Sequence, residues 1–293
     1  TPAFYNSMNH ADFGMGTWYP KGGFNAVAKG MHQLAEELGV KFKVNEEVIE
    51  IRTENNHATA VITKNSVLKA DIVISGADYA HTETLLKSTE QNYTKEYWQK
   101  KTFAPSSFLY YVAFDKKVRQ LQHHNLFFDT DFGRHAEEIY DTKTFPKKPL
   151  FYANFSSKTD DSLCPEGKEV GFFLIPVAVD LEDSKEIHDQ YFELIMDRIE
   201  KNTGENLRNS VIFKKSFGVN DFKERYHSCR GNAYGLANTL LQTSVLRPRI
   251  NNKKIKNLFY TGQLTVPGPG VPPALISGKV VTDYILKNTT RIL

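Results

Sequence analysis

The sequence predicts an α/β fold in which two domains are interleaved along the chain. A helical repeat of apolar residues precedes a hairpin and a continuously apolar strand, aromatic-rich strands fill the middle, and a last strand runs into a Gly/Pro loop and a helix. We expect residues 17–88 and 256–293 to form an α/β domain. Residues 1–16 and 89–255 should form an α+β domain, a sheet covered on one side by helices.

The α/β domain is expected from two periodicities. Apolar residues recur at helical spacing from Gly22 until Gly39, a common helix stop. Alternating segments on either side of Asn55-Asn56 are typical of a hairpin, and the Ile-Val-Ile run after Asp71 is typical of a buried strand. The expected elements are a helix at 22–39, a strand at 40–44, a hairpin at 47–53 and 58–63, a buried strand at 70–78 and a helix at 79–86.

The α+β domain is expected from a change of composition near residue 89, where charged and aromatic residues become frequent. Its strands should be the apolar and aromatic runs that follow, and one long helix interrupts them. The expected elements are strands at 106–114, 150–155, 170–176 and 211–217 and a helix at about 185–201. A strand at 255–261 then returns the chain to the first domain.

Composition excludes several classes of protein. The 293 residues are 40% hydrophobic, and a net charge of +3 is too small to imply a nucleic-acid partner. Cys164 and Cys229 have no zinc or disulfide spacing, so we expect no metal and a reducing, cytoplasmic compartment. Apolar runs fall short of the roughly 20 residues that cross a bilayer. Without an initiator Met or signal-peptide layout, the chain is expected to start within a larger protein.

The stretch from Asn257 to Lys279 carries the clearest sign of a ligand. It joins a strand through a Gly/Pro loop to a helix, which directs free backbone N–H groups and a positive helix dipole toward an anion. Gly268 and Gly270 allow close backbone approach, and Pro273 suits a first helical turn. An ordinary rigid loop is the alternative reading. The segment is not a dinucleotide fingerprint, because prolines follow where a third glycine belongs.

Several separated motifs resemble one family. They are Gly-Thr-Trp-Tyr-Pro-Lys-Gly-Gly at 16–23, Asn-Glu-Glu-Val-Ile-Glu-Ile at 45–51, Ser-Gly-Ala-Asp at 75–78, Pro-Glu-Gly at 165–167, Gly-Asn-Ala-Tyr-Gly at 231–235 and the tail at 262–278. In this order they resemble the bacterial phytoene desaturases, more closely the lycopene-forming type, over essentially the whole chain.

The resemblance implies a glutathione-reductase-like flavoprotein fold with non-covalent FAD and an apolar tunnel for a C40 polyene drawn from the membrane. The positions that match cofactor-facing positions of the family are Val48, Ser75, Gly76, Ala77, Gly262, Gln263, Gly270, Val271 and Pro272. Two departures stand out. The family's amino-terminal Gly-x-Gly-x-x-Gly half is absent from these residues, and many members have His-Pro-Gly where this chain has Thr265-Val-Pro-Gly.

A flavin that takes hydride from an allylic carbon needs no protein nucleophile, carboxylate pair or metal, so no side chain is assigned a catalytic role. Apolar walls suit such a site. The candidate wall residues are Phe108, Tyr110, Phe127, Phe128, Phe172 and Phe173, with ordinary core packing as the alternative for each. Adjacent His123 and His124 lack further ligands at metal spacing and are expected at a surface.

The expected function is therefore FAD-dependent desaturation of phytoene toward lycopene, at a membrane surface, with a quinone or oxygen as electron acceptor. Lys116, Lys117 and Arg119 could rest on anionic lipid heads. Two alternatives stay open. One is a related carotenoid oxidoreductase that acts on a hydroxylated or shorter substrate or oxygenates the polyene end. The other is an inactive membrane-binding fragment without the main FAD cradle.

Overall fold

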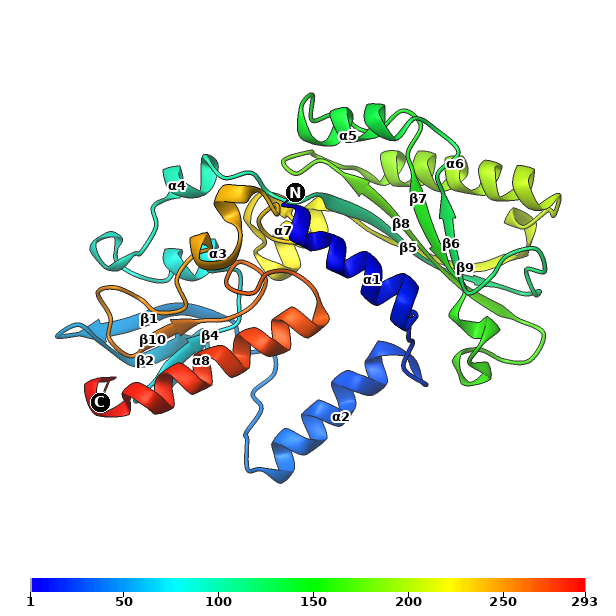
Figure 1. The fold of residues 1–293 in the computed structure, drawn as a ribbon. Helices are drawn as coiled ribbons and strands as arrows, with labels where there is room; N and C mark the ends of the chain where they lie inside the picture. Colours follow the sequence, from blue (N-terminus) through cyan, green and yellow to red (C-terminus); the bar gives the residue numbers. More distant parts are fainter. Residues whose placement is uncertain (1, 293) are drawn as a thin grey trace. The chain divides into compact units, whose positions relative to one another are not determined.

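The structure, a computed structural model, describes residues 2–292 and divides into two compact units (Figure 1). The first unit comprises Thr1–Ala3, Lys43–Ala104 and Phe222–Leu293, and the second comprises Phe4–Phe42 and Pro105–Asp221. The ranges of the two units alternate along the chain. Residues 17–42 group with the second unit, whereas residues 89–104 and 222–255 group with the first.

Two small sheets form the first unit. Strands β1 (Val48–Glu54), β2 (His57–Thr63) and β3 (Val67–Lys69) make an antiparallel sheet. Asn55 and Asn56 both have positive φ, 47° and 62°, the conformation of a tight type I′ hairpin, so the predicted hairpin is confirmed. Strands β4 (Val73–Ser75) and β10 (Leu258–Tyr260) pair in parallel. The helices are α3 (Tyr79–Thr84), α4 (Lys95–Gln99) and α8 (Val271–Ile292).

Asn257 ties the two distant halves of this unit together. Its side chain accepts a hydrogen bond from the Ala58 backbone N–H at 2.7 Å and donates to the carbonyls of Ala58 and Asp71 at 2.8 and 2.7 Å. The next residues form β10, and Phe259 packs beneath Val281 and Ile285 of α8. One buried amide therefore sets the register in which the end of the chain joins β4.

A five-stranded antiparallel sheet, in the order β6-β7-β8-β5-β9, forms the second unit. Its strands are β5 (Ser106–Phe114), β6 (His124–Phe127), β7 (Phe151–Asn154), β8 (Glu169–Val177) and β9 (Val211–Phe217). Its helices are α1 (Asn6–Met15), α2 (Gly23–Glu37), α5 (Phe132–Tyr140) and α6 (Lys185–Thr203), and α7 (Val219–Tyr226) crosses the division between the units.

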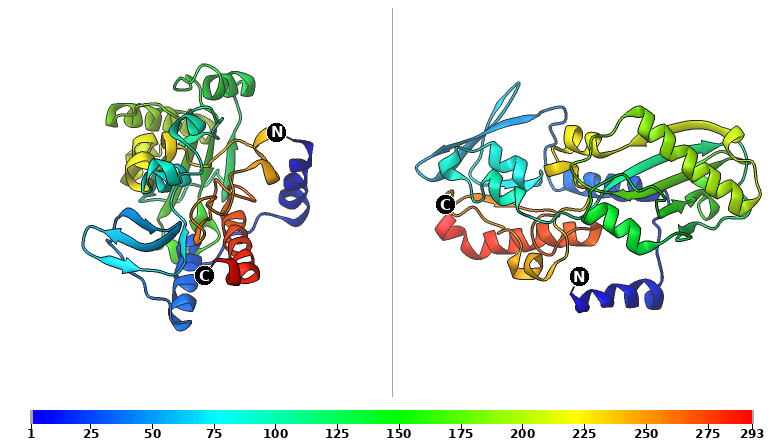
Figure 2. Two further views of the ribbon diagram at one scale, coloured as in Figure 1. Left: turned by 90° about the vertical axis from the view of Figure 1, so that its left-hand side faces the viewer. Right: turned by 90° about the horizontal axis from the view of Figure 1, so that it is seen from above.

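The core of the second unit lies between the sheet and α6, which runs across one sheet face (Figure 2). Burial alternates along β8, so every second residue points into this core, as period-two alternation requires. Phe108, Tyr110 and Phe173 of the sheet meet Phe192 and Met196 of α6 there. The sequence predicted a sheet covered on one side by helices, and the position of α6 confirms this prediction.

Some elements differ from expectation. Residues 40–44 form no strand, and no described segment pairs with them. The prediction missed β3, β6 and the short helices α1, α4, α5 and α7. Helix α2 has its predicted limits within a residue or two, yet its apolar side chains Phe24, Met31 and Leu34 are 54%, 49% and 57% exposed.

A buried acid and base join α6 to the start of α7. The Asp183 carboxylate lies 2.7 Å from His188 Nε2 and accepts a hydrogen bond from the Asn220 backbone N–H at 3.0 Å. Burial alone raises the pKa of Asp183, but these hydrogen bonds and the imidazole charge outweigh burial and lower it. A Cβ on Gly218 would lie 1.9 Å from the carboxylate, which explains the glycine at this position.

This lowered pKa predicts how stability depends on pH. A carboxyl group whose pKa is lower in the folded state stabilises the fold above its unfolded pKa, and that contribution is lost as pH falls through the folded pKa. Urea unfolding of the wild-type protein should show this loss of stability between about pH 6 and about pH 3. Asp183→Asn should lose less stability over the same range, and its urea midpoint at about pH 6 should be lower than that of the wild type. Exposed Glu182→Gln should keep the wild-type profile. An unchanged acid slope in Asp183→Asn would contradict the assignment.

Candidate functional site

The carboxyl ends of β4 and β10 lie side by side in the first unit. The Thr261 N–H donates to the Ser75 carbonyl at 2.9 Å, which extends the parallel pairing by one residue. Beyond it, a Cβ on Gly262 would be 4.0 Å from the Gly76 carbonyl oxygen. Ligands of open α/β sheets bind outside the carboxyl ends of their parallel strands. Two of the predicted cofactor segments, Ser75 to Ala77 and Gly262 to Gln263, therefore meet at such an edge.

A pocket of about 410 Å³ opens beside this edge. Val48, Ser75, Gly76 and Ala77, which were predicted from different parts of the chain, all line it. Its other lining residues are Glu47, Ile51, Val61, Val73, Ile74, His81, Leu85 and His227. The structure thus brings four predicted cofactor positions together on one mostly apolar wall. A flat aromatic ring system fits such a wall.

Two histidines and a carboxylate that the sequence analysis missed form the polar rim of this pocket. The rings of His81 and His227 stack with centroids 4.0 Å apart, and His227 Nε2 lies 3.6 Å from a Glu47 oxygen. Partial burial, together with the neighbouring His227, lowers the pKa of His81. Neither histidine could be singled out from the sequence, because the two lie far apart in the chain and belong to no motif.

Asp78 holds the turn that precedes the rim. Its carboxylate accepts hydrogen bonds from the backbone N–H of His81 at 3.2 Å, capping α3, and from that of Cys229 at 3.1 Å. Burial raises the pKa of Asp78 in spite of these bonds. The motif Ser-Gly-Ala-Asp therefore positions both the pocket wall and the loop that carries His227.

The segment after β10 is fixed to the rest of the first unit by backbone and side-chain contacts. The Gly262 N–H donates to Ser277 Oγ at 2.9 Å, and Gln263 Nε2 donates to Asn232 Oδ1 at 3.1 Å. Gly235 packs against the same segment, because a Cβ there would be 2.9 Å from the Gln263 carbonyl oxygen. The motif around Gly235 thus supports the loop from beneath.

Gly235→Ala is expected to displace this loop. The new Cβ meets backbone, and the positive φ of 74° adds strain, so we expect a loss of about 2–3 kcal/mol in the free energy of unfolding of the first unit. Gly262→Ala is the control within the same unit, since Gly262 has φ 94° but no atom nearer than 4.0 Å to an added Cβ. Chemical denaturation of both variants measures the difference. Equal losses would show that Gly235 is needed for its φ alone.

Arg247 lies beneath the same loop and is only 4% exposed. Its guanidinium donates to the carbonyls of Gln263 at 3.1 Å and Leu236 at 3.3 Å, and to Asn238 Oδ1 at 2.7 Å. A Cβ on Gly268 would approach the guanidinium to 3.0 Å, so the glycine allows the loop to rest on this side chain. The sequence analysis did not single out Arg247, because a lone arginine before a proline has no distinctive pattern.

The predicted residues Gly270, Val271 and Pro272 begin helix α8. Gly270 has φ 117°, a region that favours glycine, and its carbonyl accepts the Ala274 N–H at 2.9 Å. Val271 and Pro272 are exposed, so the first turn of the helix is accessible. The predicted sequence of strand, loop and helix is confirmed, and its residues fit the anionic part of a nucleotide cofactor.

Four of the predicted tunnel-wall residues lie in the closed core of the second unit. Phe108, Tyr110, Phe127 and Phe173 are at most 7% exposed and pack under α6, so we assign them to core packing, the alternative considered for each. Phe172 points to the opposite sheet face, where its ring lies 5.3 Å from that of Tyr111. Phe128 is 59% exposed beyond the end of β6.

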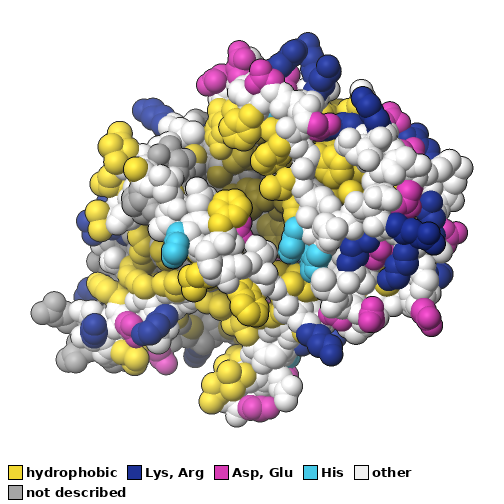
Figure 3. Space-filling view, turned by 45° about the vertical axis from the view of Figure 1, so that its right-hand side comes forward, with side chains coloured by type: hydrophobic (Ala, Val, Ile, Leu, Met, Phe, Trp, Pro, Cys, Tyr) yellow, Lys and Arg dark blue, Asp and Glu magenta, His cyan; other side chains and the backbone are white. Residues whose placement is uncertain are grey.

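The sheet face opposite α6 carries a straight apolar row, which we call the apolar stripe. Strand register places Leu126 opposite Tyr152, Tyr152 opposite Leu174, Leu174 opposite Leu109, and Leu109 opposite Phe217. Four strand spacings of about 4.8 Å make this row roughly 19 Å long. Hydrophobic side chains are widely exposed on one face of the molecule in Figure 3, whereas Lys and Arg gather mainly toward the right of that view.

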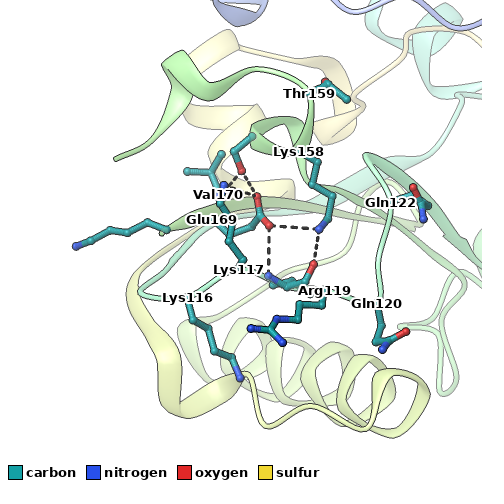
Figure 4. Close-up of polar contacts among 12 residues, drawn as sticks. Lys116, Lys117, Arg119, Gln120, Gln122, Lys158, Thr159, Glu169 and Val170 are labelled. Atoms are coloured by element: carbon teal, nitrogen blue, oxygen red, sulfur yellow. Dashed lines mark hydrogen bonds and ion pairs between the residues drawn. The ribbon is translucent and has the colours of Figure 1, made fainter. Parts of the chain in front are cut away.

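The basic residues predicted to contact lipid lie at the far end of β5. Lys117 Nζ and Lys158 Nζ approach the fully buried Glu169 carboxylate at 3.8 and 3.3 Å, as Figure 4 shows. Lys116 lies 3.9 Å from Glu205, while the Arg119 side chain is exposed. Much of this positive charge therefore neutralises buried or partly buried carboxylates.

His123 and His124 contact neighbouring side chains. His123 Nδ1 lies 2.6 Å from Thr159 Oγ1, and His124 Nδ1 lies 2.5 Å from the Tyr152 hydroxyl. Within residues 2–292 no group of three His, Cys, Asp or Glu side chains is arranged to hold a metal ion. Of the helices described, none is long and apolar enough to cross a membrane.

Comparison with known proteins agrees with this geometry. Residues 1–286 match the family described as flavin containing amine oxidoreductase. The carotenoid 3,4-desaturase of Haloarcula japonica is 41% identical over 289 residues, 98% of this chain and 58% of that protein. The zeta-carotene-forming phytoene desaturase of Myxococcus xanthus is 29% identical over 296 residues, 98% of this chain and 56% of that protein. The chain thus spans less than two thirds of either relative, and the predicted resemblance to carotenoid desaturases is confirmed.

Solved structures support the fold. An oxidoreductase from Methanosarcina mazei aligns with a TM-score of 0.63 at 20% identity, over 96% of this chain and 58% of that one. A putrescine oxidase variant aligns with a TM-score of 0.54 at 12% identity, over 90% of this chain and 53% of that one. The α/β fold of flavin-dependent oxidoreductases is therefore confirmed for this chain.

Proposed function

Because the chain belongs to the family of flavin-containing amine oxidoreductases, we propose that it forms part of an FAD-dependent carotenoid desaturase that converts phytoene toward lycopene. The observation that carries this proposal is the apolar stripe on a sheet face that α6 leaves open. A row of apolar side chains about 19 Å long suits an extended hydrocarbon chain far better than a compact amine.

The residues present fit the flavin cofactor. Val48 and Ser75 to Ala77 line a pocket suited to an aromatic ring, and Gly262, Gln263 and the first turn of α8 offer close backbone approach. We propose that these residues, with Gly270, Val271 and Pro272, hold FAD together with the amino-terminal half that the family carries. When bound, the flavin supplies the two-electron acceptor for removing hydride from an allylic carbon.

The side chains described here have binding and positioning roles. The apolar stripe aligns the polyene and excludes water, because it offers the chain no hydrogen-bonding partner apart from the Tyr152 hydroxyl. Arg247 and Asn232 hold the loop at Gln263 in one conformation. When both the polyene and the loop are held in place, the substrate meets the flavin site in a fixed orientation. Such orientation is a large part of catalysis.

The substrate is proposed from the relatives. One similar protein is named a carotenoid 3,4-desaturase and another a phytoene desaturase, so a modified carotenoid is the second candidate substrate. The test incubates the full-length, flavin-loaded protein separately with phytoene and with acyclic carotenoids that are already desaturated. We expect red lycopene from the incubation with phytoene. Conversion of the already desaturated carotenoids alone would replace phytoene by the second candidate.

We further propose that the protein works in the cytoplasm as a peripheral membrane enzyme, with a quinone or oxygen accepting the electrons. A polyene is insoluble in water, and exposed Arg119 near Lys116 and Lys117 offers positive charge for anionic lipid heads. Sedimentation with vesicles that contain anionic lipid should exceed sedimentation with neutral vesicles. Sedimentation without retained flavin would instead support an inactive membrane-binding fragment.

A further inference from the structure

An apolar pocket of about 280 Å³ lies at one end of the apolar stripe, between α5 and strands β6, β7 and β8 of the second unit. It shares Leu126, Tyr152 and Leu174 with the stripe. Its remaining lining residues are Pro105, Phe128, Phe132, His135, Ala136, Ile139, Tyr140, Leu150, Phe151 and Pro176. A hydrocarbon chain that lies along the apolar stripe therefore extends into this pocket and stays in contact with apolar side chains.

The imidazole among the lining side chains, that of His135, is engaged by the backbone on both sides. Its Nδ1 accepts the Leu150 N–H at 3.0 Å, which leaves Nε2 as the donor to the Pro176 carbonyl at 3.1 Å. Burial lowers the pKa of His135, in agreement with this neutral form. Both ring nitrogens are used, so the imidazole has no hydrogen bond to offer a ligand.

The tyrosine hydroxyls of the lining do not create a polar site either. The Tyr152 hydroxyl accepts from Asn154 Nδ2 at 2.8 Å and lies 2.5 Å from His124 Nδ1. Tyr140 is 46% exposed and sits at the rim. Inside the rim, a ligand meets aliphatic and aromatic carbon.

We propose that this pocket binds the unfunctionalised hydrocarbon end of the polyene and discriminates against ends that carry a hydroxyl or carbonyl group. This inference rests on the proposed function and specifies its substrate class. The pocket has about twice the roughly 150 Å³ of an apolar cavity that holds benzene, so it accommodates on the order of ten carbon atoms. A buried hydroxyl without a partner costs about 1–3 kcal/mol, which corresponds to about 5- to 150-fold weaker binding.

The test measures binding of two small probes to the full-length protein, a short saturated isoprenoid hydrocarbon and the matching terminal alcohol. Measured from water, the dissociation constant of the hydrocarbon should be at least about fivefold lower than that of the alcohol, because the pocket returns no hydrogen bond for the one that the hydroxyl loses. Ala136→Trp, which fills the pocket from α5, should abolish this binding. Glu137→Trp, with the same bulk at the adjacent exposed position outside the lining, should retain it.

A third variant tests the chemistry of the pocket rather than its volume. Leu126→Gln adds a hydrogen-bonding group at a 64% exposed position on the rim and should reduce the preference for the hydrocarbon at least threefold, roughly. Equal dissociation constants of the two probes in water, or unchanged binding in Ala136→Trp, would overturn the proposal. The proposal would also be overturned if Ala136→Trp still bound the probes but no longer bound vesicles, because the pocket would then be a bilayer contact.

The outcome separates this inference from the proposed function. If the hydrocarbon probe binds as expected but no carotenoid is desaturated, the pocket stands and the proposed function fails. If phytoene is desaturated while the probes bind equally, the proposed function stands and the pocket inference fails.

Discussion

Leu109→Glu is expected to reduce the rate of phytoene desaturation by the full-length, flavin-loaded protein at least about 100-fold, or about 2.7 kcal/mol. Leu109 lies within the apolar stripe, between Leu174 and Phe217 on the neighbouring strands. A carboxylate there must lose its water when the polyene binds, and neither side chain directly opposite it is a cation, because the exposed Lys215 stands opposite Tyr111. Turnover at limiting phytoene measures the effect.

Ile212→Glu is the control for this variant. Ile212 is a 53% exposed apolar residue on the edge strand β9, at the irregular register between β9 and β5, and it lies outside the apolar stripe. It should keep near wild-type activity. Circular dichroism and the unfolding midpoint confirm that both variants fold. A Leu109→Glu protein that folds and desaturates normally would remove the stripe from the account of substrate binding.

Arg247→Ala is expected to release the loop at Gln263, which we propose as part of the flavin site. Its removal leaves the carbonyls of Gln263 and Leu236 and the Asn238 side chain without their donor inside the protein. Each unsatisfied buried group costs about 1–3 kcal/mol, so we expect a loss of about 3 kcal/mol or more in unfolding free energy. The dissociation constant for FAD should rise at least about tenfold.

Two further variants make the Arg247 result interpretable. Arg247→Lys keeps the charge but cannot span three acceptors with one ammonium group, so it should show an intermediate flavin affinity. Arg249→Ala removes an exposed side chain two residues away and should bind FAD normally. Flavin titration by fluorescence quenching gives the three constants. Wild-type affinity in Arg247→Ala would show that the loop does not need this support.

The sequence was sufficient to predict the elements whose local signals are strong. Two asparagines favour positive φ, so the turn at Asn55 and Asn56 could be placed, and apolar and aromatic runs located β5 and β8 closely. Strands such as β3 and β6 escaped prediction because they are short and are held by neighbours that are remote in the chain. Pairing with these remote neighbours determines that such segments are strands, and the local sequence pattern holds no information about that pairing.

The choice of sheet face explains why four of the candidate wall residues lie in the core of the second unit. Aromatic residues occupy both faces of the central strands, as Tyr110 and Tyr111 or Phe172 and Phe173 show. Alternation separates the two faces but does not tell which one α6 covers. The rim histidines His81 and His227 were missed for a related reason, since only the fold brings them together.

The central claim is that this chain contributes to a flavin site that oxidises an unactivated polyene. The most direct measurement is an anaerobic single turnover of the full-length, FAD-loaded protein with phytoene and no other electron acceptor. The account predicts that the visible absorbance of oxidised flavin is lost as one new double bond forms for each flavin reduced. Flavin that stays oxidised with phytoene bound, or desaturation by protein stripped of flavin, would contradict it.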